Sequence, residues 1–565
     1  MELSDKKGVQ QIVQSLAALG LKEIVICPGS RNASFVISFN RHPAFNCTSI
    51  RDERTAGFYA LGKAIELQEP VAILCTSGSA ALNFAPAIVE AYYQRIPLIV
   101  LTTDRPKEWT NQGDGQTILQ TNIYTNYIRK SYEINGDAVQ KNDLWYIERC
   151  ISEGFNIATL IDKGPVHFNI PVSEPLYGTS SIDTNNLPKI FKAIPLEKQL
   201  SKTYLEQLAN QFSSSKKVLI LVGQLYPNQK LQYLLSKIAQ LENVIILTES
   251  TSNLHHPDFV ENIDRCITGL TAEDTQKLMP DLLISIGGAI VSKRIKKLLR
   301  DYAPTFHWNI DEFDSMMDTY QSLTDAIALQ PTIFLQQLLE QIKPIASTYK
   351  SNWIALKNQK EQLHQAFCKQ IPYSDFSVFN AIYKTITPTI SVHIANSSAI
   401  RYAQLFDNSK IKCTWSNRGT SGIDGSSSTV VGSAASAPDK DFLLISGDIS
   451  FHYDKNAFWI DEQIDNLKVI IINNSGGGIF RIIPGPDKIA EREQFIETSM
   501  HTNAEKLAEH YQWNYLSVKE ENTLESTLIQ FFNKTTKRTI LEIFTDAEQN
   551  PIILEQYWKL LKDIK

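Results

Sequence analysis

The 565-residue sequence lacks several features that mark whole classes of protein. No segment is rich in Lys and Arg and the formal net charge is -6, so we expect no nucleic-acid partner, because phosphate binding needs a basic surface. No stretch approaches the ~18 apolar residues of a membrane-spanning helix, and residues 1–16 have no apolar signal core. These absences predict a cytoplasmic protein with no membrane span.

Cysteine is scarce and scattered. The seven cysteines are Cys27, Cys47, Cys75, Cys150, Cys266, Cys368 and Cys413. Their number is odd, and no CxxC or Cys/His metal spacing occurs, which argues against a disulfide framework and against a zinc site. This pattern fits a reducing cytoplasm.

Short apolar runs and helical patterns alternate along the whole chain. Such alternation is typical of parallel sheets covered by helices, so we predict an α/β fold of three consecutive parallel-sheet domains. The predicted domains are residues 1–180, 181–345 and 376–565, with a helical linker at 346–375. The predicted strands are 23–30, 71–79, 97–104, 164–171, 217–223, 243–250, 281–288, 305–311, 389–396, 412–417, 441–448, 468–474 and 538–545, and the helices include 54–67 and 80–95.

Two consecutive strands of the third domain end in residues suited to a metal site. The run 441–448 ends in Gly-Asp at Asp448, and the run 468–474 ends in Asn474 before a glycine-rich loop. Ligands of open α/β sheets bind at the carboxyl ends of strands. The Asp448 carboxylate, the Asn474 amide oxygen and the Gly476 carbonyl therefore suit Mg²⁺ and a diphosphate.

The alternative is that Asp448 caps a helix and Asn473-Asn474 forms a turn. The spacing favours the site, because a strand-terminal Gly-Asp followed 26 residues later by Asn474 resembles the diphosphate-binding motif of thiamin-diphosphate enzymes. Ile449 stands in place of the last glycine of that family's usual Gly-Asp-Gly. A literal Gly-Asp-Gly at residues 113–115 has no Asn-Asn at a similar distance, and we reject it.

A catalytic carboxylate is expected in the first domain, because thiamin chemistry needs a carboxyl group against the N1′ nitrogen of the aminopyrimidine ring. Glu53 follows a predicted strand and opens the helical pattern 54–67, so it suits this role. The alternative is that Asp52 and Glu53 only favour the helix N-terminus through its dipole. If Glu53 is buried beside the cofactor, we expect its pKa to be raised.

Cationic residues recur in loops after predicted strands in all three domains. They are Arg31, Arg105, Lys293, Arg294, Arg401 and Arg418. Arginine binds carboxylates through two parallel hydrogen bonds, so a converging set predicts a substrate with several carboxylates. The alternative is ordinary surface charge.

Seven segments, in order along the chain, carry a more specific resemblance. They are CPGSRNA, RDERTAGFYALGKA, TSGSAALNFAPAIVEAYY, LTTDRP, SNRGTSGIDG, GDISFHYDKNAF and NNSGGGIF. Together they resemble the 2-succinyl-5-enolpyruvyl-6-hydroxy-3-cyclohexene-1-carboxylate synthases over nearly the whole chain. The Asp-Ile-Ser at Asp448 is also similar to that family.

The resemblance implies a thiamin-diphosphate-dependent transferase of menaquinone biosynthesis, with three α/β domains of that enzyme type. Its members decarboxylate 2-oxoglutarate and add the succinyl-semialdehyde carbanion to isochorismate. The resemblance also implies Mg²⁺, with Mn²⁺ as an alternative, and a homodimer or homotetramer whose active sites lie at the subunit interface.

The resemblance further implies roles for single positions. Catalytic roles fall to Glu53, Gln116, Ser397, Arg401 and Arg418, the last three holding the part derived from 2-oxoglutarate. Isochorismate is implied to meet Ser30, Arg31, Arg105, Gln116, Lys293 and Arg294. The implied cofactor contacts are Glu53, Ile423, Gly447, Asp448, Ile449, Ser450, Asn474, Gly476, Gly477, Ile479 and Phe480, with the metal on Asp448, Asn474 and Gly476. Gly115 stands where the family often has an asparagine.

Three other functions are weighed against this one. Another thiamin-diphosphate carboligase or decarboxylase, similar to acetolactate synthase, is disfavoured by the cationic loops, because pyruvate has one carboxylate. A non-catalytic nucleotide-binding regulator is disfavoured because no GxGxxG follows a strand with an acidic residue about 20 positions later. A cofactor binder without catalysis is disfavoured by the presence of Glu53, Asp448 and Asn474 together.

Overall fold

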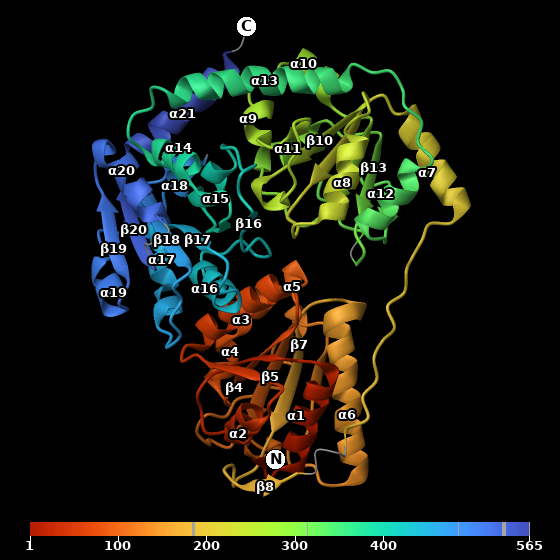
Figure 1. Ribbon diagram of the computed structural model, residues 1–565, viewed down its shortest axis with the longest axis vertical. Coiled ribbons are helices and arrows are strands. Elements are labelled where there is room, and N and C mark those ends of the chain that lie inside the picture. Colours follow the sequence, from red (N-terminus) through yellow and green to blue (C-terminus); the bar gives the residue numbers. More distant parts are fainter. Residues whose placement is uncertain (183–186, 314, 484, 534–537, 564–565) are drawn as a thin grey trace. The chain divides into compact units, whose positions relative to one another are not determined.

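The computed structural model describes residues 1–182, 187–313, 315–483, 485–533 and 538–563 (Figure 1). These residues form three six-stranded parallel sheets, which confirms the predicted α/β fold. They pack as two compact units. Unit 1 comprises Met1–Leu196, Asn417–Lys440 and Ser450–Leu467, and unit 2 comprises Glu197–Ser416, Asp441–Ile449 and Lys468–Lys565. No helix within the described ranges has the length and apolarity needed to cross a membrane.

The first sheet lies in unit 1, with its strands in the order β3-β2-β4-β5-β7-β6. The strands are β2 (Glu23–Ile26), β3 (Asn46–Ser49), β4 (Val71–Cys75), β5 (Leu98–Asp104), β6 (Ser131–Glu133) and β7 (Val166–Pro171). Its helices are α1 (Lys7–Leu19), α2 (Ala33–Arg41), α3 (Glu53–Leu67), α4 (Ser79–Asn83), α5 (Ala85–Gln94) and α6 (Lys141–Asn156), and β1 (Glu2–Ser4) pairs antiparallel with β8 (Thr179–Ser181). Strands β4 and β5 are buried along their whole length, which explains their continuous apolar sequence.

One predicted helix of this region was wrong. The pattern 80–95 folds as two helices, α4 and α5, that meet at Phe84. Pro86 stands in the first turn of α5, where its missing N–H costs no hydrogen bond. Proline therefore starts a new helix here instead of continuing the previous one.

The second sheet lies in unit 2, in the order β11-β10-β9-β12-β13-β14. Its strands are β9 (Val218–Val222), β10 (Val244–Thr248), β11 (Phe259–Val260), β12 (Leu282–Ile286), β13 (Phe306–Ile310) and β14 (Asp325–Ile327). Its helices are α7 (Lys202–Ser214), α8 (Gln229–Ile238), α9 (Ile263–Ile267), α10 (Ala272–Leu278), α11 (Lys293–Asp301) and α12 (Pro331–Leu339). Two separate apolar clusters form from the alternating side chains of β9, so both faces of the sheet are covered.

The third sheet also lies in unit 2, in the order β16-β15-β17-β18-β20-β19. Its strands are β15 (Ser391–Ile394), β16 (Cys413–Trp415), β17 (Phe442–Gly447), β18 (Leu467–Asn473), β19 (Asn514–Val518) and β20 (Thr539–Phe544). The helices are α14 (Asp375–Thr385), α15 (Ser398–Ala403), α18 (Ile479–Ile482), α19 (Glu505–His510), α20 (Glu521–Phe532) and α21 (Gln549–Lys562). Helix α13 (Tyr349–Cys368) falls within the predicted linker, whereas the exact domain boundaries stay a prediction.

Unit 1 is built from distant parts of the chain. Helix α16 (Ser426–Ser436) packs closely on α3 through two glycines. A Cβ on Gly62 would lie 1.9 Å from the Thr429 carbonyl oxygen, and one on Gly432 would lie 2.0 Å from that of Tyr59. The two helix backbones therefore touch, and neither glycine tolerates a side chain without a shift of the helices.

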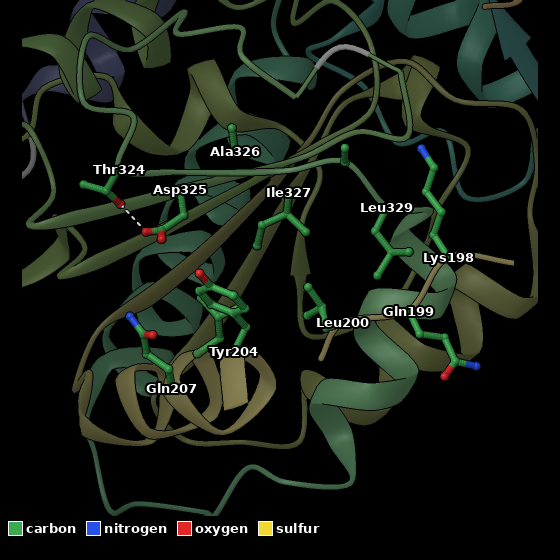
Figure 2. Close-up of a pocket in the computed structure, with 12 residues that line it drawn as sticks. Lys198, Gln199, Leu200, Tyr204, Gln207, Thr324, Asp325, Ala326, Ile327 and Leu329 are labelled. Atoms are coloured by element: carbon green, nitrogen blue, oxygen red, sulfur yellow. Dashed lines mark hydrogen bonds between the residues drawn. The ribbon is translucent and has the colours of Figure 1, made fainter. Parts of the chain in front are cut away.

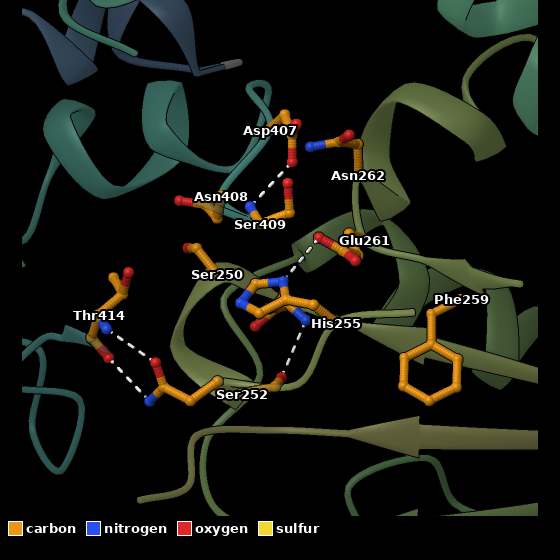
Figure 3. A network of polar contacts seen from close by, with 12 residues as sticks. Ser250, Ser252, His255, Phe259, Glu261, Asn262, Asp407, Asn408, Ser409 and Thr414 are labelled. Carbon is orange, nitrogen blue, oxygen red and sulfur yellow. Dashed lines mark hydrogen bonds and ion pairs between the residues drawn. The ribbon is translucent and has the colours of Figure 1, made fainter. Parts of the chain in front are cut away.

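A polar network in unit 2 connects the loops after β10 with the segment around β16 (Figure 3). Asn253 accepts a hydrogen bond from the Thr414 backbone N–H (2.7 Å) and donates one to the Thr414 carbonyl (3.1 Å). His255 Nδ1 lies 3.0 Å from Glu261 Oε2. His255 thus contributes to the packing of these loops.

Candidate active site

The predicted metal-binding residues come together at the carboxyl edge of the third sheet. Asp448 begins α17 (Asp448–Tyr453) directly after β17, and Asn474 follows the neighbouring strand β18. The Asp448 carboxylate accepts hydrogen bonds from the backbone N–H of Ile449 and of Gly476, each at 2.8 Å. The second bond closes the glycine-rich loop onto Asp448, so the sequence spacing has brought the two motifs into contact.

The electrostatics of this site favour a cation. Asp448 is 1% exposed, and burial raises its pKa to about 7, although the two backbone hydrogen bonds oppose the shift. The carboxylates of Asp375 and Glu542 raise it further. A divalent cation would stabilise the ionised Asp448 carboxylate, so the residues present fit the predicted metal.

Within the described ranges, no three side chains of His, Cys, Asp or Glu come together as a metal-binding group. A site made of one carboxylate, one amide oxygen and one backbone carbonyl is of a different kind, and Mg²⁺ commonly completes such a set with phosphate oxygens and water.

Asp375 is a residue of this site that sequence reasoning missed. The Asn474 amide Nδ2 donates to Asp375 Oδ2 at 2.9 Å, and Asp375 is 2% exposed at the start of α14. No local pattern marks it, because it lies 99 positions before Asn474. Ser374 is the N-cap of α14, and Asp375 is its first residue. An acidic residue in this position is common because it interacts favourably with the helix dipole, so the sequence suggests no further role for it.

The glycine-rich loop adopts conformations that need its sequence. Gly476 has a φ of +149°, in the region that favours glycine, and the Gly477 N–H donates to the Glu497 carbonyl at 2.8 Å. A Cβ on Gly478 would lie 2.7 Å from Asn474 Nδ2. Ile479 and Phe480 follow at the start of α18, half-buried.

The predicted catalytic glutamate occupies a different environment from its neighbour. Asp52 is the N-cap of α3 and accepts a hydrogen bond from the Thr55 N–H at 3.2 Å. Glu53 is half-buried, and burial raises its pKa, with the Asp52 carboxylate adding to the shift. Its charge also acts on the thiols of Cys27 and Cys75, at the carboxyl ends of β2 and β4. Glu53 thus lies at the carboxyl edge of the first sheet, as predicted from the sequence.

Ile423 and Ser450 are adjacent in unit 1. The Ser450 hydroxyl donates to the Ile423 carbonyl at 2.7 Å, and the Ile423 residue is 36% exposed. Gly447 ends β17 and Ile449 lies between Asp448 and Ser450, so the four predicted cofactor contacts from Gly447 to Ser450 are consecutive in the chain.

Two of the predicted isochorismate residues in unit 1 are fixed by carboxylates. Arg31 is buried and donates to the Val172 carbonyl (3.0 Å) and to Glu174 (3.1 Å). Arg105 pairs with Asp114 at 2.8 Å and donates to the Gly115 carbonyl at 3.0 Å. The rejected Gly-Asp-Gly at 113–115 therefore serves to hold Arg105.

Ser30 and Gln116 are exposed near these arginines in the sequence, and Gln116 has a positive φ of 54°. Arg418 is half-buried, and its loop is fixed because the N–H groups of Gly419 and Thr420 donate to Glu90 (2.8 and 2.7 Å). Three loops that carry predicted substrate residues are thus held in defined positions in unit 1.

The remaining predicted substrate residues lie in unit 2. Ser397 has φ 75° and ψ −130°, a conformation that non-glycine residues rarely adopt and that is concentrated at functional sites. Arg401 is half-buried on α15, and the carboxylates of Asp264 and Glu249 act on its charge.

Lys293 is exposed at the start of α11. The next residue, Arg294, is engaged inside unit 2: it donates to Thr268 Oγ1 at 3.0 Å, and its guanidinium carbon lies 4.1 Å from the centre of the Trp558 ring. Sequence reasoning missed these two contacts, because Thr268 and Trp558 are distant in the chain. The contact of Arg294 with isochorismate stays a prediction.

A cavity of about 650 Å³ lies elsewhere, beside the edge strand β14 (Figure 2). Lys198, Leu200, Tyr204 and Ile327 contribute to its lining, and no predicted site residue does. It is therefore separate from the candidate active site.

Comparison with known proteins places the chain in a class. Residues 6–123 match the family model of the thiamine pyrophosphate enzyme N-terminal TPP binding domain, and residues 194–392 match that of the middle domain of thiamine pyrophosphate enzymes. The chain is thus a thiamin-diphosphate-dependent enzyme, in agreement with the Asp448 and Asn474 motif.

Full-length relatives narrow the class to one family. A 2-succinyl-5-enolpyruvyl-6-hydroxy-3-cyclohexene-1-carboxylate synthase of Flavobacterium psychrophilum is 42% identical over 98% of each chain. Synthases of the same name from Bacteroides thetaiotaomicron (36% identical, 99% of each chain) and Porphyromonas gingivalis (35%, 99% of this chain and 97% of the relative) also match. The chain belongs to this family of synthases, as the resemblance of its motifs predicted.

Proposed function

We propose that the protein decarboxylates 2-oxoglutarate and joins the remaining four-carbon unit to isochorismate, as a carboligase of menaquinone biosynthesis. The observation that carries this proposal is the buried Asp448 carboxylate beside Asn474 and the glycine-rich loop, in a chain that matches the synthase relatives over nearly its whole length. The raised pKa of Glu53 supports it independently.

The cofactor site follows from the same residues. Mg²⁺, or Mn²⁺ in its place, would be held by the Asp448 carboxylate, the Asn474 amide oxygen and the Gly476 carbonyl. Gly447, Ile449, Ser450 and Gly477 would meet the diphosphate, and Ile423, Ile479 and Phe480 would pack against the rings. When bound, thiamin diphosphate supplies the nucleophile that attacks the 2-oxo carbon and the electron sink for loss of CO₂.

The chain's own groups bind, orient and move protons. Glu53 would hold the proton exchanged with the aminopyrimidine N1′ once the cofactor is bound, and its raised pKa suits this role. Arg401, Arg418 and Ser397 bind the carboxylates of 2-oxoglutarate. The groups that bind isochorismate are Ser30, Arg31, Arg105, Gln116, Lys293 and Arg294. Water must be kept out of this site, because it would otherwise protonate the carbon that must form the new bond.

The assembly is also part of the proposal. We infer a cytoplasmic homodimer or homotetramer, in which active sites at the subunit interface combine the first domain of one subunit with the third domain of another. The domains would be residues 1–180, 181–345 and 376–565, joined by the linker 346–375. Sedimentation of the purified protein with and without cofactor tests the oligomeric state.

The reaction is tested by measuring CO₂ release from 2-oxoglutarate with thiamin diphosphate and Mg²⁺, with and without isochorismate, while products are followed by mass. Release that depends on isochorismate and yields the adduct is expected. Release without an adduct would point to a decarboxylase, and reaction with pyruvate in place of 2-oxoglutarate would point to an acetolactate-synthase-like enzyme.

A further inference from the structure

Two adjacent asparagines at the end of β18 are each held by a different buried carboxylate. Asn473 Nδ2 donates to Glu542 Oε1 at 2.7 Å, and Asn474 Nδ2 donates to Asp375 Oδ2 at 2.9 Å. The two carboxylate residues are 0% and 2% exposed. Each amide therefore faces a group that water does not reach.

Both Asp375 oxygens accept hydrogen bonds, Oδ2 from Asn474 Nδ2 and Oδ1 from Thr545 Oγ1, so the Asn474 amide turns its NH₂ edge toward Asp375. The opposite edge then carries the oxygen. Asn473 uses its oxygen locally, because Oδ1 accepts from the Ser475 N–H at 3.1 Å. The Oδ1 atom of Asn474 points away from Asp375. This oxygen is the atom that would bind the metal ion.

Asp375 is itself fixed from several sides. Its Oδ1 accepts from Thr545 Oγ1 at 2.6 Å, and its backbone N–H donates to Asn550 Oδ1 at 2.8 Å. Gly478 leaves room for the Asn474 amide, since a Cβ there would lie 2.7 Å from Nδ2. Asp375 therefore offers the Asn474 amide an acceptor in a fixed position.

We propose that Asp375 is a positioning residue of the metal site, which selects the orientation of Asn474 that presents oxygen to the cation. An amide NH₂ cannot bind Mg²⁺, because its nitrogen offers protons and no free electron pair. Reversal of the Asn474 amide would thus remove one of three protein ligands. The inference rests on the metal site proposed above.

The test measures metal binding directly. In Asp375→Asn, the oxygen at position 375 still accepts from Thr545 Oγ1, so the new NH₂ group faces Asn474 and favours the reversed Asn474 amide. We expect the affinity for Mn²⁺, measured by electron paramagnetic resonance of the free ion in the presence of thiamin diphosphate, to fall at least about tenfold. Glu542→Gln is the matched control: it removes a second carboxylate whose charge acts on Asp448 but which holds Asn473, and we expect a much smaller loss.

The exchanged pair Asp375→Asn with Asn474→Asp separates orientation from charge. The carboxylate introduced at position 474 would present oxygen on both edges, and the amide introduced at position 375 would donate to it. We therefore expect Mn²⁺ affinity to recover toward that of the wild type. Melting temperatures without metal report folding.

Equal losses in Asp375→Asn and Glu542→Gln would overturn the inference, because charge alone would then explain both. A folded exchanged pair that binds no Mn²⁺ would also overturn it, even if the single variant does not fold. A wild-type protein that binds thiamin diphosphate but no Mn²⁺ or Mg²⁺ would instead remove the proposed metal site, and the orienting role with it.

Discussion

Asp52 and Glu53 are neighbours in the chain, yet their carboxylates have different surroundings. Asp52 caps helix α3 and accepts hydrogen bonds from the Thr55 N–H (3.2 Å) and from Asn456 Nδ2 (2.6 Å). Burial raises the pKa of Glu53, which opens the helix at the edge of the first sheet. Asp52 thus takes the helix-capping role that the sequence allowed for either residue. Glu53 is not used in this way and suits the proposed proton transfer.

Replacing the proposed catalytic glutamate should separate these roles. In Glu53→Gln the side chain keeps its size but cannot exchange a proton, so we expect turnover about 10²–10⁴-fold lower. Binding of thiamin diphosphate, followed by fluorescence quenching, should remain measurable. Asp52→Asn is the control, because asparagine also caps helices. A similar loss of turnover in both variants would favour the helix-dipole explanation instead.

A methyl group on Gly478 should weaken the proposed metal site. The added Cβ would lie 2.7 Å from Asn474 Nδ2 and would push the amide off its present position. We expect Gly478→Ala to reduce Mn²⁺ affinity about tenfold, as expected for a residue that supports a metal ligand. An unchanged dissociation constant would mean that the loop absorbs the extra group without moving Asn474.

Arg105 and Arg401 should each affect the binding of a different substrate. Loss of a charged hydrogen bond costs about 1.5–3 kcal/mol, which corresponds to about 10- to 100-fold in KM. Arg105→Gln should raise the KM of isochorismate, and Arg401→Gln that of 2-oxoglutarate. Steady-state kinetics with each substrate varied in turn measures both, and a reversed pattern would contradict the assigned roles.

The strained backbone at Ser397 predicts a conflict between stability and activity. Its φ of 75° with ψ −130° costs about 1–3 kcal/mol, which glycine avoids, although glycine also gives the unfolded chain more freedom. Ser397→Gly should therefore be about 1 kcal/mol more stable and less active. Urea unfolding and turnover, measured on the same preparation, test the pair of effects; a destabilised variant would mean that the Ser397 side chain contributes more than the strain costs.

Acid should destabilise unit 1 through a buried histidine. His167 lies between the hydroxyls of Thr102 (2.8 Å) and Ser131 (3.1 Å), and burial lowers its pKa to about 3. The unfolded chain, with a pKa near 6.5, binds the proton more readily, so stability is full above about pH 6.5 and falls as the pH drops toward 3.

The loss at pH 5 should be about 2 kcal/mol from this residue. His167→Gln should reduce the dependence of the melting temperature on pH between about 5 and 6.5, and the remaining slope belongs in part to His307, His364 and His393, whose pKa burial also lowers. The exposed His501→Gln serves as control and should leave the slope unchanged. A slope in His167→Gln equal to that of the wild type would contradict the contribution of His167.

The sequence predicted the inner strands and the edge strand β16, but it missed the other five edge strands of the three sheets, β3, β6, β11, β14 and β19. Runs such as 71–79 are apolar because both faces of β4 are covered. Strand β3 (Asn46–Ser49) has no fully buried residue, and β6 (Ser131–Glu133) and β14 (Asp325–Ile327) have three residues each. Short strands at a sheet edge are partly exposed and need few apolar residues. Their sequences therefore show no clear hydrophobic pattern.

The same limit applies to the site. Asp448, Asn474 and Glu53 directly follow strands. The ends of parallel strands lie at one edge of the sheet, so the place of these residues in the sequence predicts their place in the fold. Asp375 reaches Asn474 only through the packing of α14 against the sheet, a contact across 99 residues that no local pattern encodes.

Helix α3 is synthesised long before α16, the helix that packs against it. The Gly62 face of α3 is covered by residues near Thr429, which the ribosome adds only after the whole central region. At about 5–20 residues per second this leaves the helix uncovered for tens of seconds. This face of α3 therefore stays uncovered until the late segment is made, and a fragment of residues 1–196 expressed alone should aggregate or require a chaperone.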